Sequence, residues 1–256
     1  MQLIQYRVVL VTVLGSLAAC APKDAARTGA ADSATVAVDS AGARSAAAVP
    51  ARRLTVLFVG TSLTAGLGLD PDEAYPALIQ LKADSAHVPI DVVNAGLSGE
   101  TSAGALRRID WLLNGPADVV VIETGANDGL RGLDVDSTRA NLQALVNKVK
   151  AAKPATRIAL IQMEAPPNLG PRYTATFHAM YPTVAASSGA TLLPFLLNGV
   201  AGKVELNQGD GIHPNLKGER MVASNVWTAL QPLVNQGPDS SLRTPHVEAR
   251  LRRASK

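Results

Sequence analysis

Five short apolar runs, each followed by a helical pattern, constrain the fold of this chain more than any other feature of its sequence. The runs are rich in β-branched residues and cover residues 54–59, 90–94, 118–123, 157–162 and 191–195. The helical patterns lie after them, at about 73–84, 101–113, 137–152, 174–187 and 214–234. Strands that are apolar throughout and alternate with helices are typical of parallel sheets covered on both faces. The sequence therefore predicts an α/β domain built around a five-stranded parallel sheet.

The predicted domain spans residues 54–235, which is long enough to bury about 70% of the surface of its unfolded chain. The stretch before it, residues 20–53, consists largely of Ala, Ser, Thr, Gly and Asp. Such small and polar side chains cannot build a core, so this stretch is predicted to be a flexible tether. Residues 236–256 contain two prolines and a basic cluster, and are predicted to form a solvated, disordered tail.

The distribution of charge argues against a nucleic-acid partner. The pI near 9.1 is basic, but the net charge is +3 for residues 1–53, −3 for 54–237 and +3 for 238–256. A nucleic-acid-binding domain needs clustered Lys and Arg on the domain itself, and aromatic side chains for stacking. Aromatic residues make up only 4% of this chain. The basic excess therefore belongs to the ends, and no nucleic-acid partner is predicted.

The N-terminus has the pattern of a secretion signal. Arg7 precedes an apolar run over residues 8–19, which is too short for a stable membrane span. The segment Leu17-Ala-Ala-Cys20 resembles the bacterial lipobox, in which cleavage precedes a cysteine that then carries lipid. This resemblance implies a signal peptide over 1–19 and a lipid anchor on Cys20, at the cell envelope. Because Ala21 is not the aspartate of inner-membrane retention, it further implies the outer membrane, facing the periplasm. The alternative is an ordinary cleaved signal peptide with Cys20 incidental.

Polar side chains and glycines follow the predicted strands where a parallel sheet binds its ligands. The segments are GTSLTAG at 60–66, NAGLSGET at 94–101, ETGANDG at 123–129 and DGIHP at 210–214. Each has a structural explanation when taken alone: Ser62 can cap a helix, and Asn127-Asp128-Gly129 is a common turn. Their joint occurrence favours a catalytic site.

These segments together supply the groups that acyl transfer requires. Ser62 is the candidate nucleophile, and His213 is the candidate base that takes its proton. Asp210, three residues earlier, can reach the other imidazole nitrogen. The Ser62 N–H, the Gly96 N–H and the Asn127 side-chain amide are candidate oxyanion donors. The sequence therefore predicts a Ser-His-Asp hydrolase; no metal is required.

The four segments resemble, in order, the blocks of the SGNH (GDSL-type) hydrolases. Residues 123–132 (ETGANDGLRG), 168–173 (NLGPRY) and 192–195 (LLPF) further resemble the bacterial arylesterase, acyl-CoA thioesterase and lysophospholipase branch. The resemblance implies a three-layer flavodoxin-like fold, no cofactor, and hydrolysis of carboxylic and thioester acyl bonds. Thr61 departs from the family's usual aspartate. Since threonine can also accept a backbone N–H at a helix start, we expect the turn to survive.

Two loops are predicted to bind the substrate, which we expect to be an aryl ester or a lysophospholipid. Their apolar residues are Leu130, Leu133, Pro167 and Leu169. A carbohydrate O-deacetylase on the same scaffold is an alternative that these apolar side chains disfavour. A non-catalytic binding lipoprotein is a second alternative, and the complete Ser-His-Asp set argues against it. The chain lacks the G-x-S-x-G, Walker A and HExxH motifs of other enzyme classes.

Overall fold

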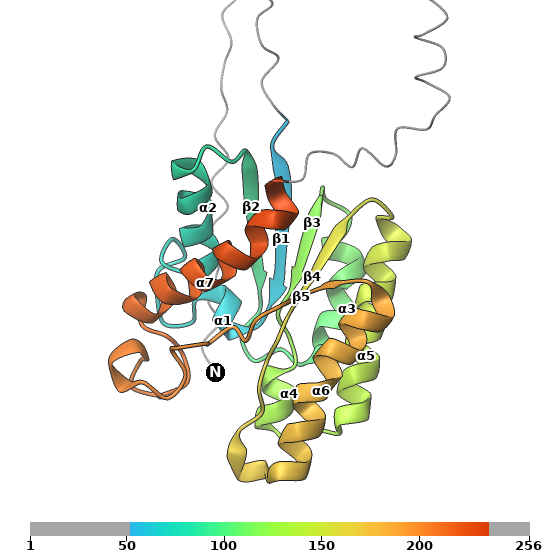
Figure 1. Ribbon diagram of the computed structural model, residues 1–256, viewed down its shortest axis with the longest axis vertical. Coiled ribbons are helices and arrows are strands. Elements are labelled where there is room, and N and C mark those ends of the chain that lie inside the picture. Colours follow the sequence, from blue (N-terminus) through green and yellow to red (C-terminus); the bar gives the residue numbers. More distant parts are fainter. Residues whose placement is uncertain (1–51, 236–256) are drawn as a thin grey trace, which may run out of the picture. The chain divides into compact units, whose positions relative to one another are not determined.

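The computed structural model describes residues 52–235, whose centre is a five-stranded parallel sheet (Figure 1). Its strands are β1 (Leu54–Gly60), β2 (Ile90–Gly96), β3 (Val119–Ile122), β4 (Arg157–Ile161) and β5 (Thr191–Leu193). The spatial order is β2-β1-β3-β4-β5, and all four pairings are parallel. The predicted parallel sheet of flavodoxin-like order is therefore confirmed. β5 ends before Pro194, which has no N–H to donate to the sheet.

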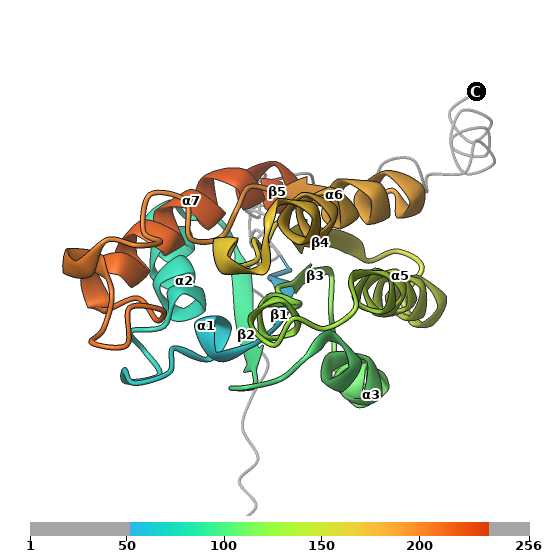
Figure 2. The ribbon, with the colours of Figure 1, turned by 90° about the horizontal axis from the view of Figure 1, so that it is seen from below.

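Helices cover both faces of the sheet, as Figures 1 and 2 show from two directions. On one face α2 packs against α7, and on the other α3 packs against α5 and α5 against α6. Their bounds are α2 Tyr75–Ser85, α3 Ser102–Leu112, α5 Val135–Ala152, α6 Pro171–Ser188 and α7 Leu216–Asn235. The remaining short helices are α1 Ser62–Ala65, α4 Ala126–Leu130, η1 Pro167–Leu169 and η2 Val204–Leu206. The five longer helices were predicted from the sequence, and the short ones were not.

The core lies between the two helical layers. All four residues of β3 are buried, and β1 is buried except for the partly exposed Thr55. Phe58 of β1 packs edge-on against Tyr75 of α2, with ring centroids 5.6 Å apart. Each such buried side chain contributes about 1.5–3 kcal/mol relative to exposure. The apolar runs of β1, β3 and β4 are thus explained by coverage on both faces, whereas the edge strands β2 and β5 contain exposed residues and are less buried than the sequence predicted.

The direction of strand order reverses between β1 and β3. The chain moves from β1 to β2 on one side and then returns to β3 on the other. At such a switch point the loops after neighbouring strands diverge and leave room for a ligand at the carboxyl edge of the sheet. Ser62 follows β1 at this edge.

The predicted signal peptide, Cys20, most of the tether and the tail lie outside the described residues. No helix between residues 52 and 235 is long and apolar enough to cross a membrane.

Candidate active site

Ser62 is the first residue of α1, immediately after the turn that ends β1. The turn is tight because Gly60 has no side chain: a Cβ there would lie 2.0 Å from Thr64 Oγ1 and 2.8 Å from Glu123 Oε2. Ser62 is 8% exposed, and its Oγ lies 2.9 Å from His213 Nε2. The fold therefore brings together two side chains that are 151 residues apart in the sequence.

His213 lies in the loop that leads into α7, where Asp210 orients its ring. Asp210 Oδ2 is 2.6 Å from His213 Nδ1, and Asp210 Oδ1 accepts the backbone N–H groups of Ile212 (2.9 Å) and His213 (3.0 Å). The hydrogen bond from the His213 ring, followed by the two backbone donors, holds the pKa of Asp210 well below its usual value. Because the ionised carboxylate requires a proton on Nδ1, Nε2 is left as the acceptor for the serine hydroxyl.

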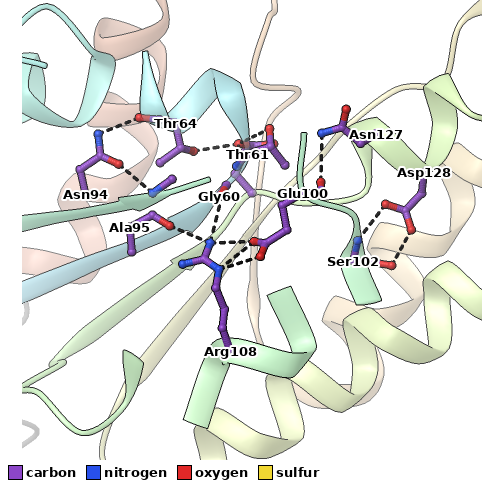
Figure 3. Close-up of polar contacts among 12 residues, drawn as sticks. Gly60, Thr61, Thr64, Asn94, Ala95, Glu100, Ser102, Arg108, Asn127 and Asp128 are labelled. Carbon is purple, nitrogen blue, oxygen red and sulfur yellow. Dashed lines mark hydrogen bonds and ion pairs between the residues drawn. The ribbon is translucent and has the colours of Figure 1, made fainter. Parts of the chain in front are cut away.

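The Asn127 side chain is fixed at the cleft by one of its two amide hydrogens. Its Nδ2 donates to the Glu100 carbonyl oxygen at 3.0 Å (Figure 3). The second amide hydrogen remains for a ligand in the cleft, which Asn127 lines. Residues 127–129, for which a turn was the structural alternative, lie within α4.

Gly96 does not occupy the position predicted for it. Its N–H donates to Asn94 Oδ1 at 2.9 Å, and it does not line the cleft. A Cβ at Gly96 would lie 2.3 Å from the backbone nitrogen of Ala65, so the glycine allows α1 to pack on the end of β2. The prediction of Gly96 as an oxyanion donor is therefore wrong in this geometry.

Gly99, three residues later, has the properties that were predicted for Gly96. It lines the cleft, and its φ of 77° places it in the left-handed region that favours glycine. Its N–H has no acceptor among residues 52–235. The sequence did contain a signal for Gly99, which stands just before the start of a predicted helix. The loop has two glycines, however, and the sequence does not show which of them lines the cleft.

A cleft of about 200 Å³ lies beside the Ser62 hydroxyl. It is lined by Thr61, Ser62, Leu63, Leu67, Gly99, Ala126, Asn127, Leu130, Ile212 and His213. Of the four predicted substrate-binding residues only Leu130 is among them. The other three do not line it: the Leu133 carbonyl accepts the Tyr173 hydroxyl, Leu169 lies beside Gly132, and Pro167 is exposed at the start of η1. Leu67 and Ile212, which sequence analysis missed, take their places at the cleft.

A buried polar network lies behind the nucleophile. Glu123 accepts the Thr61 N–H (2.8 Å), the Thr61 hydroxyl (3.1 Å) and the Thr64 hydroxyl (2.8 Å). Burial raises the pKa of Glu123 to about 7, and these donors oppose the rise. Thr61 makes no capping hydrogen bond, because its hydroxyl donates to this carboxylate instead. The turn survives the replacement of the family aspartate, as predicted, but for a different reason.

A second buried carboxyl, Glu219 of α7, is 2% exposed and accepts the backbone N–H of Tyr75 at 2.8 Å. Burial raises its pKa to about 8, and the nearby Glu123 charge adds to the rise. The folded protein therefore holds a proton that the unfolded chain releases above pH 4.5, so this group's contribution to stability is lost as pH rises from about 4.5 through 8.

Replacing Glu219 with glutamine should remove this pH dependence. Because each unit of pKa difference corresponds to about 1.4 kcal/mol, the wild type should lose a few kcal/mol of unfolding free energy between pH 5 and 8 relative to Glu219→Gln. Urea unfolding at both pH values measures this difference. The exposed Glu205→Gln variant is the control and should follow the wild type. Parallel pH curves for Glu219→Gln and the wild type would contradict the assignment.

A flavodoxin-like sheet with a hydrogen-bonded Ser-His-Asp set at its carboxyl edge defines an SGNH-type serine hydrolase. Within residues 52–235 no three His, Cys, Asp or Glu side chains gather as a metal site would require. The GDSL-like lipase/acylhydrolase family matches residues 58–221, and the chain belongs to this family.

Several bacterial ester hydrolases are similar in sequence to the chain over this domain. Esterase TesA of Pseudomonas aeruginosa is 42% identical over 182 residues, which is 70% of this chain and 89% of that protein. Thioesterase 1/protease 1/lysophospholipase L1 of Escherichia coli is 40% identical over 182 residues, covering 71% and 85%. The crystal structure of the psychrotrophic esterase EstA from Pseudoalteromonas is 40% identical, with a TM-score of 0.67, and covers 71% of this chain and 99% of that one.

Proposed function

We propose that this protein is a serine esterase in which Ser62 attacks the acyl carbonyl of the substrate. His213 Nε2 takes the Ser62 proton and passes it to the leaving alcohol, which departs as the acyl-enzyme forms. Water then attacks the acyl-enzyme and loses a proton to His213, which returns it to Ser62 Oγ as the bond between the acyl carbon and Oγ breaks and the carboxylic acid is released. Asp210 holds the imidazole in the required tautomer and stabilises its charged form. The continuous hydrogen-bonded chain, 2.9 Å and then 2.6 Å between heavy atoms, is the observation that carries this proposal.

Charge on the carbonyl oxygen develops in the tetrahedral intermediate and needs donors already in place. The N–H of Ser62, the N–H of Gly99 and the free amide hydrogen of Asn127 are the groups we assign to this role. All three residues line the same cleft. Gly99 replaces Gly96 in this assignment, because the Gly96 N–H is used by Asn94.

We infer an apolar acyl group from the cleft wall, which Leu67, Leu130 and Ile212 line while remaining 44–48% exposed. Burying one methylene contributes about 0.8 kcal/mol, which corresponds to about fourfold in rate or affinity. On p-nitrophenyl esters, kcat/KM should therefore rise a few-fold per methylene from acetate to at least butyrate. If kcat/KM were instead highest on acetyl esters, above all on acetylated sugars, the result would support the deacetylase alternative.

Two leucines of similar exposure give this test a matched pair. Leu130 lines the cleft and is 48% exposed, whereas Leu133 is 40% exposed and lies outside it. Leu130→Ala should flatten the dependence on chain length, and Leu133→Ala should leave it unchanged. The same response in both variants would refute the placement of the acyl group.

Esters and lysophospholipids, rather than cytosolic thioesters, are the substrates that an exported enzyme would meet.

We also propose that Cys20 carries a lipid anchor, on the basis of its lipobox-like context. Cys20→Ser should then move the protein from the membrane fraction to a soluble or unprocessed form, because a cleaved signal peptide cannot anchor the chain. Cell fractionation with immunoblotting measures this shift. Normal processing with unchanged membrane association would refute lipidation.

A further inference from the structure

The guanidinium group of Arg108 on α3 meets the ends of two strands and one loop (Figure 3). Its Nε and Nη2 donate to both carboxylate oxygens of Glu100 at 2.7–2.9 Å. Nη2 also donates to the Ala95 carbonyl at 2.8 Å, near the end of β2, and to the Gly60 carbonyl at 3.3 Å, at the end of β1. One side chain therefore joins β1, β2 and the loop between β2 and α3.

Two of these attachment points, Gly60 and Glu100, lead to the oxyanion donors. Gly60 ends β1, two residues before the Ser62 N–H. Gly99 is the residue before Glu100; it lines the cleft, and its N–H has no acceptor in the described residues. The Glu100 carbonyl oxygen accepts Asn127 Nδ2 at 3.0 Å and thereby orients its amide. Arg108 touches none of these donors and lies behind all three.

The peptide unit between Gly60 and Thr61, one unit before the one that carries the Ser62 N–H, is held from both sides. Its carbonyl oxygen, from Gly60, accepts hydrogen bonds from Leu97 N–H at 2.9 Å and from Arg108 at 3.3 Å, and its N–H, from Thr61, donates to Glu123 Oε2 at 2.8 Å. A peptide plane fixed at both polar atoms cannot rotate without breaking one bond. The orientation of the turn that carries the nucleophile therefore depends on Arg108 as well as on Glu123.

The geometry requires an arginine rather than any cation. The side chain of Glu100 is only 5% exposed, so its charge needs a partner, and the planar fork of Arg108 supplies a bidentate one. One Nη2 hydrogen is then left, and the Ala95 and Gly60 carbonyls share it. A lysine would carry the charge, but it would replace the two-nitrogen pairing with Glu100 by a single point contact and would lose the planar geometry that directs Nη2 at the strand ends.

We propose that Arg108 is a positioning residue for ester hydrolysis, which holds the three oxyanion donors in register through Glu100 and the ends of β1 and β2. The inference rests on the oxyanion assignment under the proposed function. It predicts a defect in transition-state stabilisation, since the substrate itself does not touch Arg108.

The test is Arg108→Lys in the full chain, with kcat and KM measured on p-nitrophenyl butyrate. A displacement of about 1 Å in catalytic groups can cost about 10²-fold, so kcat should fall by about that factor. KM should change by no more than about threefold, because ground-state contacts are retained. Arg107→Lys is the matched control: Arg107 is the neighbouring arginine of α3, is exposed, and should keep wild-type kinetics.

Two further variants make each outcome decisive. Glu100→Gln, in which an amide nitrogen would face the arginine donors, should lower kcat in the same direction, and it carries the test if Arg108→Lys does not fold. Wild-type kcat in a folded Arg108→Lys or Glu100→Gln enzyme, or a loss confined to KM, would overturn the inference while leaving the esterase mechanism intact. Wild-type kcat for Asn127→Ala would instead overturn the oxyanion assignment, and the inference with it.

Discussion

Replacing Ser62 with alanine should lower kcat on p-nitrophenyl butyrate by about 10⁶-fold, and His213→Ala should lower it by nearly as much. The two losses are similar because nucleophile and base act as one unit, joined at 2.9 Å between Ser62 Oγ and His213 Nε2. Without the base the hydroxyl remains protonated, and without the hydroxyl the base has no nucleophile to activate. The double variant should therefore be little worse than either single one.

Steady-state and single-turnover assays on folded, purified protein measure this effect. His178→Ala is a demanding control, because His178 Nδ1 lies 2.7 Å from Glu164 Oε1 and so imitates the pairing of His213 with a carboxylate. His178 does not line the cleft, and its other ring nitrogen has no hydroxyl partner among residues 52–235. Its loss should leave kcat unchanged. A Ser62→Ala enzyme that kept a tenth of wild-type turnover would show that another residue is the nucleophile.

Asn127→Ala should lower kcat by about 10²–10³-fold with a smaller change in KM. The reason is that one amide hydrogen of Asn127 is already used by the Glu100 carbonyl at 3.0 Å, which aims the other at the cleft. A donor held in this way interacts weakly with a neutral carbonyl and strongly with the oxyanion. The variant therefore loses stabilisation chiefly in the transition state.

The comparison of kcat with KM decides this prediction. Asn147→Ala provides the control, since Asn147 is an exposed asparagine of α5 that accepts a hydrogen bond only from Gln143 in the described part of the chain. It should match the wild type in both constants. If Asn127→Ala raised KM and left kcat intact, Asn127 would be a substrate-binding residue, and the oxyanion would need another donor.

The order of elements could be read from the sequence because it depends on local periodicity. Apolar runs of strand length alternate with helical patterns, and strands buried on both faces leave this signal whatever the loops do. The short helices α1 and α4 were missed for the opposite reason. Four or five residues are too few to show a 3.6-residue period. In α4, Asp128 is held by a tertiary contact, since it is buried and accepts the Ser102 N–H at the start of α3 at 2.8 Å.

The identity of the hydrogen-bond donors at the site followed from the sequence only in part. Ser62 follows the end of β1, and Asp210 and His213 lie in the loop before α7; these residue types have few other uses in combination. The prediction named Gly96 and did not consider Gly99, because the distinction depends on which N–H already has an acceptor. Asn94 Oδ1 accepts the Gly96 N–H, whereas Gly99 lines the cleft and its N–H has no acceptor among the described residues. Spacing along the chain contains no information on this point.

By itself, then, the sequence determined the parallel α/β architecture, the family and the three side chains that the structure joins by hydrogen bonds, Ser62, His213 and Asp210, since periodicity and local motifs are sufficient for these. Only the tertiary structure decided which groups face the substrate. It brought Ser62 and His213 together across 151 residues, placed Leu130 rather than Leu133 at the cleft, and set Arg108 behind the oxyanion donors. The physical reason is that a hydrogen bond or an apolar contact depends on direction and distance in space, and these are set by strand order and by the packing of loops against one another.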